Sequence, residues 1–187
     1  AYNEQQTIIQ DYLQLIRGPT YTGSDEATPK DFIGPSSTTL QIVNVAPVNK
    51  DANVVSIRSN YTVTDKADGD RKMIYISKTG KIYLITTLLS IEFTGAKTDN
   101  KKIFNTLLDG EHIKHNKTGQ FINLYAAFDI YYMGGKDMRE LVFTSSASKP
   151  ELGTETEKVD KTEKVDKTEK VAKSRWDILR YVIQNME

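Results

Sequence analysis

The sequence predicts an α+β fold, built mainly from an antiparallel sheet with flanking helices. Three observations lead to this fold class. Apolar residues follow a helical spacing near both ends of the chain. From Thr39 onward they follow a period of two, which is typical of strands. The connections at residues 78–80 and 116–119 are short and contain glycine, which favours hairpins and therefore antiparallel pairing.

The two predicted helices have recognisable ends. Residues 7–17 carry one broad apolar face, and Gly18-Pro19 ends this helix because glycine tolerates the left-handed conformation and proline cannot continue the ladder. Ser174 is the expected N-cap of a second helix that runs to residue 186. The apolar stripe of that helix is expected to consist of Trp176, Leu179, Val182, Ile183 and Met186.

Between these helices we expect a loop followed by nine strands. The loop spans residues 20–38, which are rich in Thr, Ser, Gly and Pro. The strands are expected at residues 40–45, 54–58, 61–64, 73–77, 81–86, 89–93, 106–113, 121–132 and 140–143.

Composition divides the chain into three parts. Residues 1–149 form the predicted domain, and residues 150–173 form a charged insertion with hexads of the type Thr-Glu-Lys-Val-Asp-Lys. Six residues correspond to about 600° of helix, so the valines of successive hexads share no face and the insertion has no side to bury. We expect residues 174–187 to form an amphipathic helix that packs back on the domain.

Overall composition excludes several classes of protein. The 25 Lys and Arg residues balance 25 Asp and Glu residues, which argues against a strongly basic protein that coats nucleic acid. Because the chain has no cysteine, it has no disulfide, thiolate metal site or cysteine nucleophile. No apolar run approaches the roughly 20 residues that a membrane span needs. We therefore expect a soluble, intracellular protein that has no membrane partner.

A lysine at a predicted strand end is the first candidate for chemistry. Lys66 is followed by Asp68 and Gly69, so a strand runs into a tight turn with a carboxylate two residues from the amine. Such a lysine is a nucleophile when nearby positive charge or desolvation keeps its amine neutral. Taken alone, such a motif is more often a solvated surface turn, since Asp-Gly is a preferred turn pair.

Two carboxylates on a later strand are the second candidate. Asp109 and Glu111 are two residues apart, so on a strand they share one face. Two like charges there repel unless a cation or substrate hydroxyl groups lie between them, which makes both residues candidate metal ligands. The alternative is an exposed strand with solvated carboxylates.

An aromatic residue flanked by alanines is the third candidate. Phe128 follows Ala126 and Ala127 on the strand at residues 121–132, and alternation places it on the face opposite Asp129. A ring beside small residues offers a flat surface on which a base can stack. Taken alone, an aromatic strand is more often part of a core.

In this order, the three segments resemble the signatures of the covalent nucleotidyltransferase superfamily, which includes mRNA capping guanylyltransferases and polynucleotide ligases. The matching stretches are Lys66-Ala-Asp-Gly-Asp-Arg71, Leu108-Asp-Gly-Glu111 and Ala127-Phe-Asp-Ile-Tyr-Tyr132. Within the superfamily, the sequence is most similar to capping enzymes of large DNA viruses, of the poxvirus and mimivirus type. The resemblance covers about residues 30–143.

The resemblance implies a fold and a reaction. The fold is the nucleotidyltransferase domain of the ATP-grasp-like or ligase type. The reaction is the transfer of GMP from GTP, through a lysyl-GMP intermediate on Lys66, to the 5′ diphosphate end of RNA. It implies Mg²⁺ or Mn²⁺ as cofactor, held by Asp109 and Glu111. The implied nucleotide-binding residues are Asp68, Gly69, Arg71, Glu111 and Phe128. Arg71 and Glu111 would contact the ribose, and Phe128 would stack on guanine.

The same resemblance implies partners and a location. The partners are GTP, the RNA 5′ end and further capping-enzyme domains such as a triphosphatase and a methyltransferase. The location is the host cytoplasm, in a viral factory, or the virion.

The sequence also departs from the family pattern. A Glu-Gly strand and a Lys-x-Lys strand are expected downstream of the third signature, and neither is found, nor is there room for an oligonucleotide-binding-fold lid. The chain is therefore predicted to be the front part of a nucleotidyltransferase domain that catalyses poorly by itself. Three alternatives stay open: an ATP-dependent polynucleotide ligase adenylation domain, a non-catalytic binding or scaffold module that retains the fold, and an unrelated α+β domain with coincidental motifs.

Overall fold

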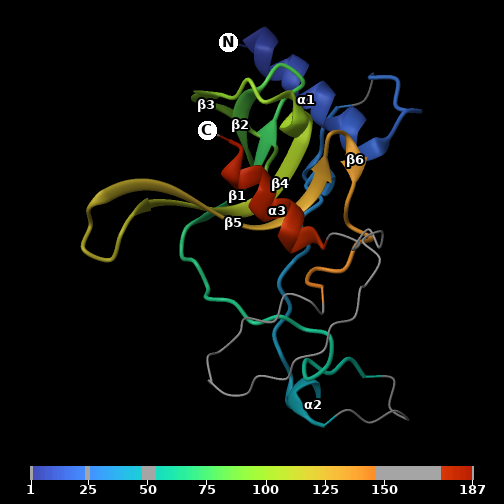
Figure 1. Ribbon diagram of the computed structural model, residues 1–187, viewed down its shortest axis with the longest axis vertical. Coiled ribbons are helices and arrows are strands. Elements are labelled where there is room, and N and C mark those ends of the chain that lie inside the picture. Colours follow the sequence, from blue (N-terminus) through green and yellow to red (C-terminus); the bar gives the residue numbers. More distant parts are fainter. Residues whose placement is uncertain (1, 24–25, 48–53, 146–173, 187) are drawn as a thin grey trace, which may run out of the picture.

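The computed structural model describes residues 2–23, 26–47, 54–145 and 174–186 of the chain, and its centre is one antiparallel sheet (Figure 1). The sheet has six strands in the order β3-β2-β1-β4-β5-β6, and every neighbouring pair is antiparallel. The strands are β1 Asp70–Ile76, β2 Lys81–Thr86, β3 Ile91–Lys97, β4 Thr106–His115, β5 Phe121–Met133 and β6 Lys136–Asp137. The predicted α+β class is confirmed.

Two helices pack on opposite faces of this sheet. The helix α1, Tyr2–Arg17, shares one apolar cluster with Met73 and Tyr75 of β1. The helix α3, Arg175–Gln184, shares a second cluster with Ile74 and Ile76 of the same strand. Because successive strand residues point to opposite faces, the two clusters form separate cores above and below the sheet. None of the described helices is long and apolar enough to cross a membrane.

The predicted end of α1 at Gly18 and the predicted N-cap of α3 are confirmed, whereas α1 begins earlier than predicted, at Tyr2, and α3 ends earlier, at Gln184. The buried face of α3 also differs from the expected stripe. Gly18 has a φ of +84°, and its amide donates to the carbonyl of Gln14, which closes α1. The Ser174 hydroxyl accepts a hydrogen bond from the Asp177 amide, as an N-cap does. The buried side chains of α3 are Ile178, Leu179 and Val182. Trp176 and Ile183 are 37% and 46% exposed, so α3 is rotated relative to the predicted stripe.

Five of the nine predicted strands are confirmed, four of them with shifted ends and β2 with the predicted bounds, and the other four predicted strands are wrong. Residues 40–45 contain the four-residue helix α2, Ile42–Val45, and residues 54–58, 61–64 and 140–143 form no strand. Side chains that the alternation would bury lie in solvent there; Val63 is 96% exposed. A period of two marks a strand only where a neighbouring strand pairs with it, and these segments have no pairing partner among the described residues. The predicted hexad insertion lies outside the described residues.

The segment that follows β6 and the start of α3 lie side by side. The Arg175 amide donates to the Val142 carbonyl at 3.0 Å, and the Trp176 amide donates to the Phe143 carbonyl at 2.9 Å. The rings of Phe143 and Trp176 also contact each other, with centroids 6.2 Å apart. The start of α3 is therefore joined directly to the segment that follows the sheet.

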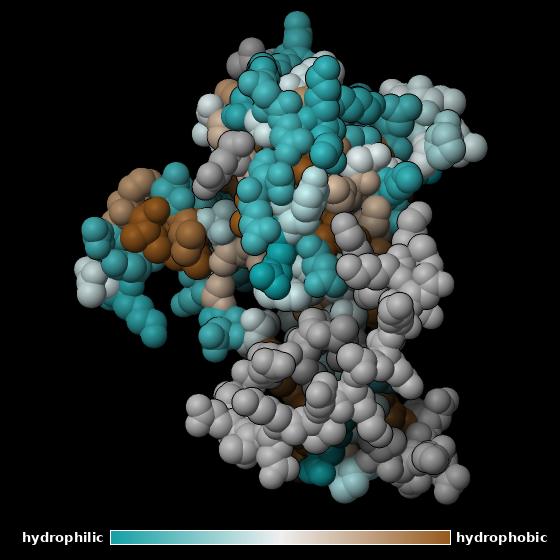
Figure 2. Space-filling model, viewed as in Figure 1, coloured by the Kyte–Doolittle hydropathy of each residue, from teal (hydrophilic) through white to brown (hydrophobic). Residues whose placement is uncertain are grey.

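Strands β4 and β5 continue past the sheet as a long hairpin (Figure 1). Pairing of β1 with β4 ends at His112, so beyond that residue the two strands pair only with each other. Exposed apolar side chains, including Phe121, Ile122 and Leu124, gather on this projecting end (Figure 2). Toward the opposite end, the same two strands are more buried and contribute Glu111 and Phe128 to the cavity described in the next subsection.

The packing of α3 can be tested with Leu179→Ala, which removes a fully buried side chain from its inner face. Loss of a buried leucine side chain typically lowers the free energy of unfolding by about 2–5 kcal/mol. The control is Ile183→Ala on the same helix, where a half-exposed side chain is expected to cost less than about 1 kcal/mol. Urea denaturation measures both values. Equal losses would show that α3 does not pack through its Leu179 face.

Candidate functional site

A cavity of about 770 Å³ lies between β4, β5, the segment before β1 and the start of α3. Its lining includes Lys66, Glu111 and Phe128, which come from three different segments of the chain. Asp129 and Arg175 line the same cavity. Volumes of about 300–1,000 Å³ are usual for small-molecule sites, so the cavity is large enough for a mononucleotide.

A bulge in β5 explains how consecutive residues reach this cavity. Asp109 pairs with Asp129 and Gly110 pairs with Ala127, which leaves Phe128 as an extra residue in β5. An extra residue interrupts the strict alternation of side chains. Phe128 and Asp129, which alternation predicts on opposite faces, therefore both line the cavity.

Lys66 lies in the segment before β1, and no strand precedes it among the residues that the structure describes. Its side chain is 83% exposed, and its Nζ donates to the Ala67 carbonyl at 3.2 Å. The Asp68 carboxylate lies 3.9 Å from the same nitrogen. The amine thus lines the cavity without a strong partner among the described residues, and bound anionic groups can reach it.

Glu111 contributes an unsatisfied polar atom. Its Oε2 is buried and has no hydrogen-bond partner among the described residues. A buried acceptor without a partner costs free energy, so a hydroxyl donor or a cation bound in the cavity would stabilise it. Glu111 is therefore the carboxylate available to a ligand.

Asp109 has a different environment from Glu111, although the sequence predicts both residues as metal ligands. Its side chain is fully buried and does not line the cavity. Arg71 donates to both carboxylate oxygens, from Nη2 at 2.6 Å and from Nε at 3.2 Å, and the Tyr131 hydroxyl donates to Oδ2. The charge of Asp109 is therefore already compensated. No group of three possible metal-ligating side chains occurs within the described part of the chain.

Arg71 supports the wall of the cavity instead of lining it. The hydrogen bonds that it donates to Asp109 raise the pKa of its guanidinium group above the usual value. Its Nη1 donates to the Pro35 carbonyl at 2.6 Å, and its guanidinium carbon lies 6.0 Å from the centroid of the Phe128 ring. Because Pro35 and Phe128 both line the cavity, Arg71 holds two parts of its wall in place.

Two further residues of the first signature lie away from the cavity lining. Asp68 is fully exposed. A Cβ at position 69 would lie 2.7 Å from the His112 carbonyl oxygen, so Gly69 is needed where the chain approaches β4 closely. Of the predicted site residues, the structure brings Lys66, Glu111 and Phe128 together in the cavity lining, and it leaves Asp68, Gly69, Arg71 and Asp109 outside this lining.

Sequence analysis missed the ion pair between Asp129 and Arg175. Nε of Arg175 donates to Oδ1 of Asp129 at 2.8 Å, and Nη2 donates to Oδ2 at 3.2 Å. Asp129 belongs to the third signature, but alternation predicted that it points away from Phe128. Arg175 is 46 residues further along the chain, so no local pattern connects the two.

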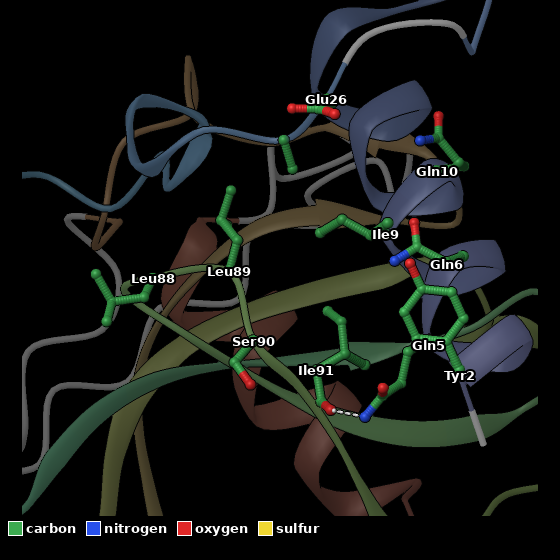
Figure 3. Close-up of a pocket in the computed structure, with 11 residues that line it drawn as sticks. Tyr2, Gln5, Gln6, Ile9, Gln10, Glu26, Leu88, Leu89, Ser90 and Ile91 are labelled. Atoms are coloured by element: carbon green, nitrogen blue, oxygen red, sulfur yellow. Dashed lines mark hydrogen bonds between the residues drawn. The ribbon is translucent and has the colours of Figure 1, made fainter.

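A second cavity, of about 500 Å³, lies between α1 and the turn that joins β2 to β3 (Figure 3). Glutamine side chains of α1 face it, and Gln5 donates to the Ile91 carbonyl at 3.0 Å. Among the described residues that line it, Glu26 is the only charged one. Because no described lining side chain is cationic, this cavity is less suited to phosphate groups than the cavity beside β5.

The cavity beside β5 offers an amine for phosphate groups, an unsatisfied carboxylate oxygen and an aromatic ring, which together suit a nucleotide-binding domain. The sequence matches the family model described as mRNA capping enzyme, catalytic domain, over residues 47–184. This match spans well over half of the chain, and the chain belongs to that family.

A relative supports the same family. The chain is 36% identical over 96 residues to a protein of Acanthamoeba polyphaga mimivirus described as a probable mRNA-capping enzyme. The aligned stretch covers 51% of this chain and 8% of the mimivirus protein. The chain thus corresponds to a small part of that relative.

The buried ion pair of Asp109 can be tested with Asp109→Asn. This change leaves the Arg71 guanidinium without its charged partner and is expected to lower the free energy of unfolding by about 2–4 kcal/mol, since breaking a buried pair is costly. The control is Asp137→Asn, which removes the partner of Arg139 from a more exposed pair and should cost less than about 1 kcal/mol. Urea denaturation of both variants measures the difference. Equal losses would contradict a special role of the Arg71–Asp109 pair.

The environment of Tyr131 predicts a dependence of stability on alkaline pH. Burial raises the pKa of its hydroxyl above the usual 10.0, and the hydrogen bond to Asp109 raises it further. Above about pH 10 the unfolded chain loses this proton more readily than the folded one, so stability is complete below that pH and falls above it. Urea denaturation between about pH 9 and pH 11 should show a shallower decline for Tyr131→Phe than for the unmodified chain. Parallel declines would contradict the raised pKa.

Proposed function

We propose that this domain carries out the guanylyltransferase step of mRNA capping, with Lys66 as the nucleophile. The proposal is supported most directly by the common cavity of Lys66, Glu111 and Phe128, residues that three separate signatures contribute. Membership of the capping-enzyme family supports the choice of GTP as the nucleotide. The catalytic role of Lys66 and the identity of the RNA acceptor are parts of this proposal.

The proposed reaction has two displacements at one phosphorus atom. The neutral amine of Lys66 attacks the α-phosphorus of GTP, an N–P bond forms, the bond to the bridging oxygen breaks and pyrophosphate leaves. The amine gives up a proton to solvent in this step. An oxygen of the RNA 5′ diphosphate then attacks the same phosphorus, the N–P bond breaks and the lysine regains a proton. Division into two steps lets one nucleotide site serve both transfers.

The wall residues orient the nucleotide in this proposal. Arg71 lies over the Phe128 ring on one side, so the opposite side of the ring is the surface proposed for the base. Glu111 is proposed to accept a hydrogen bond from a ribose hydroxyl or to hold a divalent cation through its unsatisfied oxygen. The exposed amine of Lys66 is proposed to meet the phosphates.

A divalent cation fits one of the two residues that the sequence suggested. Mg²⁺ is often held by one or two carboxylates together with substrate phosphates, and Glu111 can supply such a carboxylate, whereas Asp109 is engaged by Arg71. A bound Mg²⁺ or Mn²⁺ would withdraw electron density from the phosphate groups. The residues of this chain would still provide the nucleophile and the surface for the base.

Further domains and a location are also part of the proposal. The mimivirus relative is much longer than the stretch it shares with this chain. We propose that triphosphatase and methyltransferase activities accompany this domain, and that it acts in a viral factory of the host cytoplasm or in the virion.

The nucleophile can be tested by adduct formation with α-labelled GTP and Mg²⁺. The protein together with any further domains of the same polypeptide is expected to form a labelled adduct that survives denaturation, and the 187-residue chain alone is expected to form it slowly. Lys66→Ala and Lys66→Arg should each abolish the label, because neither side chain offers a neutral primary amine. Lys117→Ala, in the hairpin turn outside the cavity, is the control and should keep it.

The outcomes separate the candidate functions. A label from ATP alone would indicate a ligase-type adenylation domain, and no label from either nucleotide would indicate a binding or scaffold module. An undiminished label in Lys66→Ala would contradict the assignment of the nucleophile.

A further inference from the structure

The geometry points to Asp129, held by Arg175, as the residue that selects guanine over adenine in this cavity. The inference rests on the proposed function and extends it to the choice of base. It depends on the position of the pair, on the hydrogen-bonding groups that the pair leaves available, and on the difference between the edges of the two purines.

The pair lies beside the surface proposed for the base. Asp129 follows Phe128 directly, and the bulge in β5 brings both into the lining of one cavity. The side chains of Asp129 and Arg175 are 18% and 19% exposed, so water reaches them only in part. A base that stacks on Phe128 would place its edge within the same cavity wall, where hydrogen bonds face reduced competition from water.

Arg175 is held firmly. Its Nη1 donates to two backbone carbonyls, that of Leu141 at 2.6 Å and that of Arg139 at 3.2 Å. Its guanidinium carbon lies 5.4 Å from the centroid of the Phe143 ring, and its own amide bonds to the Val142 carbonyl. A guanidinium fixed in this way holds the carboxylate of Asp129 in a defined orientation, which a base-reading group requires.

The pair retains hydrogen-bonding capacity. Arginine has five N–H donors, and the described contacts of Arg175 use four of them, which leaves one on Nη2. The Oδ1 atom of Asp129 accepts from Arg175 and from the Ile130 amide, whereas Oδ2 accepts one described hydrogen bond, from Arg175. A carboxylate oxygen accepts about two hydrogen bonds, so Oδ2 can accept another.

These groups complement guanine. On its Watson–Crick edge, guanine presents two adjacent donors, N1–H and the exocyclic amino group at C2, next to the acceptor O6. The Oδ2 atom of Asp129 can accept one further hydrogen bond, which the amino group at C2 would donate, and the remaining Nη2–H of Arg175 can donate to O6. Adenine presents the N1 lone pair and a C2–H at the corresponding positions, so it offers no donor to Oδ2. The pair therefore favours guanine and disfavours adenine.

A purely structural role for this ion pair makes a different prediction. The pair also joins β5 to the start of α3, so its loss could weaken the cavity wall. Weakening of the wall would reduce the affinity for all nucleotides by the same factor. A base-reading role changes the ratio of affinities, which is the quantity to measure.

The experiment is calorimetric titration of the 187-residue chain with GTP, ITP and ATP. ITP differs from GTP only in lacking the amino group at C2. We expect GTP to bind at least about tenfold more tightly than ITP or ATP, which corresponds to the lower part of the range for a bidentate contact to a base. This comparison uses the unmodified chain and does not depend on whether a variant folds.

Two variants and one control complete the test. Asp129→Asn exchanges an acceptor oxygen for a donor and should reduce the GTP-to-ITP ratio at least about fivefold. Arg175→Lys keeps the charge but loses the planar fork, and should also reduce the ratio. Asp137→Asn alters the ion pair with Arg139, which does not line the cavity, and should leave the ratio unchanged.

The inference is overturned if GTP, ITP and ATP bind the unmodified chain equally, or if Asp129→Asn keeps the original ratio. If the Lys66 adduct forms under these circumstances, the proposed nucleotidyl transfer stands and only the role of Asp129 is wrong. If the chain binds none of the three nucleotides, both the inference and the proposed nucleotide site are wrong.

Discussion

The buried ion pair between Arg71 and Asp109 is the contact on which the arrangement of the cavity depends. It joins β1 to β4, and the Tyr131 hydroxyl links β5 to the same carboxylate. Because the guanidinium also bonds to the Pro35 carbonyl and lies over Phe128, one compensated charge connects three strands, a loop and an aromatic ring. A carboxylate without exposure to solvent would be too costly here without this partner.

Residues of the sheet and Lys66, which lies outside the sheet, contribute to the cavity in different ways. Asp109, Arg71 and Tyr131 of the sheet are hydrogen-bonded to one another, so they define the shape of the cavity wall. Lys66 lies outside the sheet and is largely solvated, so its amine can move toward a phosphate group. A fixed binding surface beside a solvated amine suits the proposed reaction, in which the bound nucleotide reacts first with the amine of Lys66 and then with a second substrate.

The sequence predicted the central sheet well because its strands pair with neighbours that bury them. Alternation failed at Val63, where no pairing strand is described and the side chain lies in solvent, and at Asp129, where a bulge changes the direction of the side chains. Short signatures predicted Lys66, Glu111 and Phe128 correctly as neighbours in space. They could not distinguish Asp109 from Glu111, because burial and a partner 38 residues away decide which carboxylate remains available.

The backbone hydrogen bonds between the segment after β6 and the start of α3 have a consequence for evolution. The Phe143 carbonyl and the Trp176 amide are joined directly, so the stretch between them begins and ends at one place on the surface. The entropy of closing a loop grows only with the logarithm of its length. A change in the number of repeat units therefore need not displace Arg175, and relatives of this chain are expected to differ in repeat number more readily than in the residues on either side.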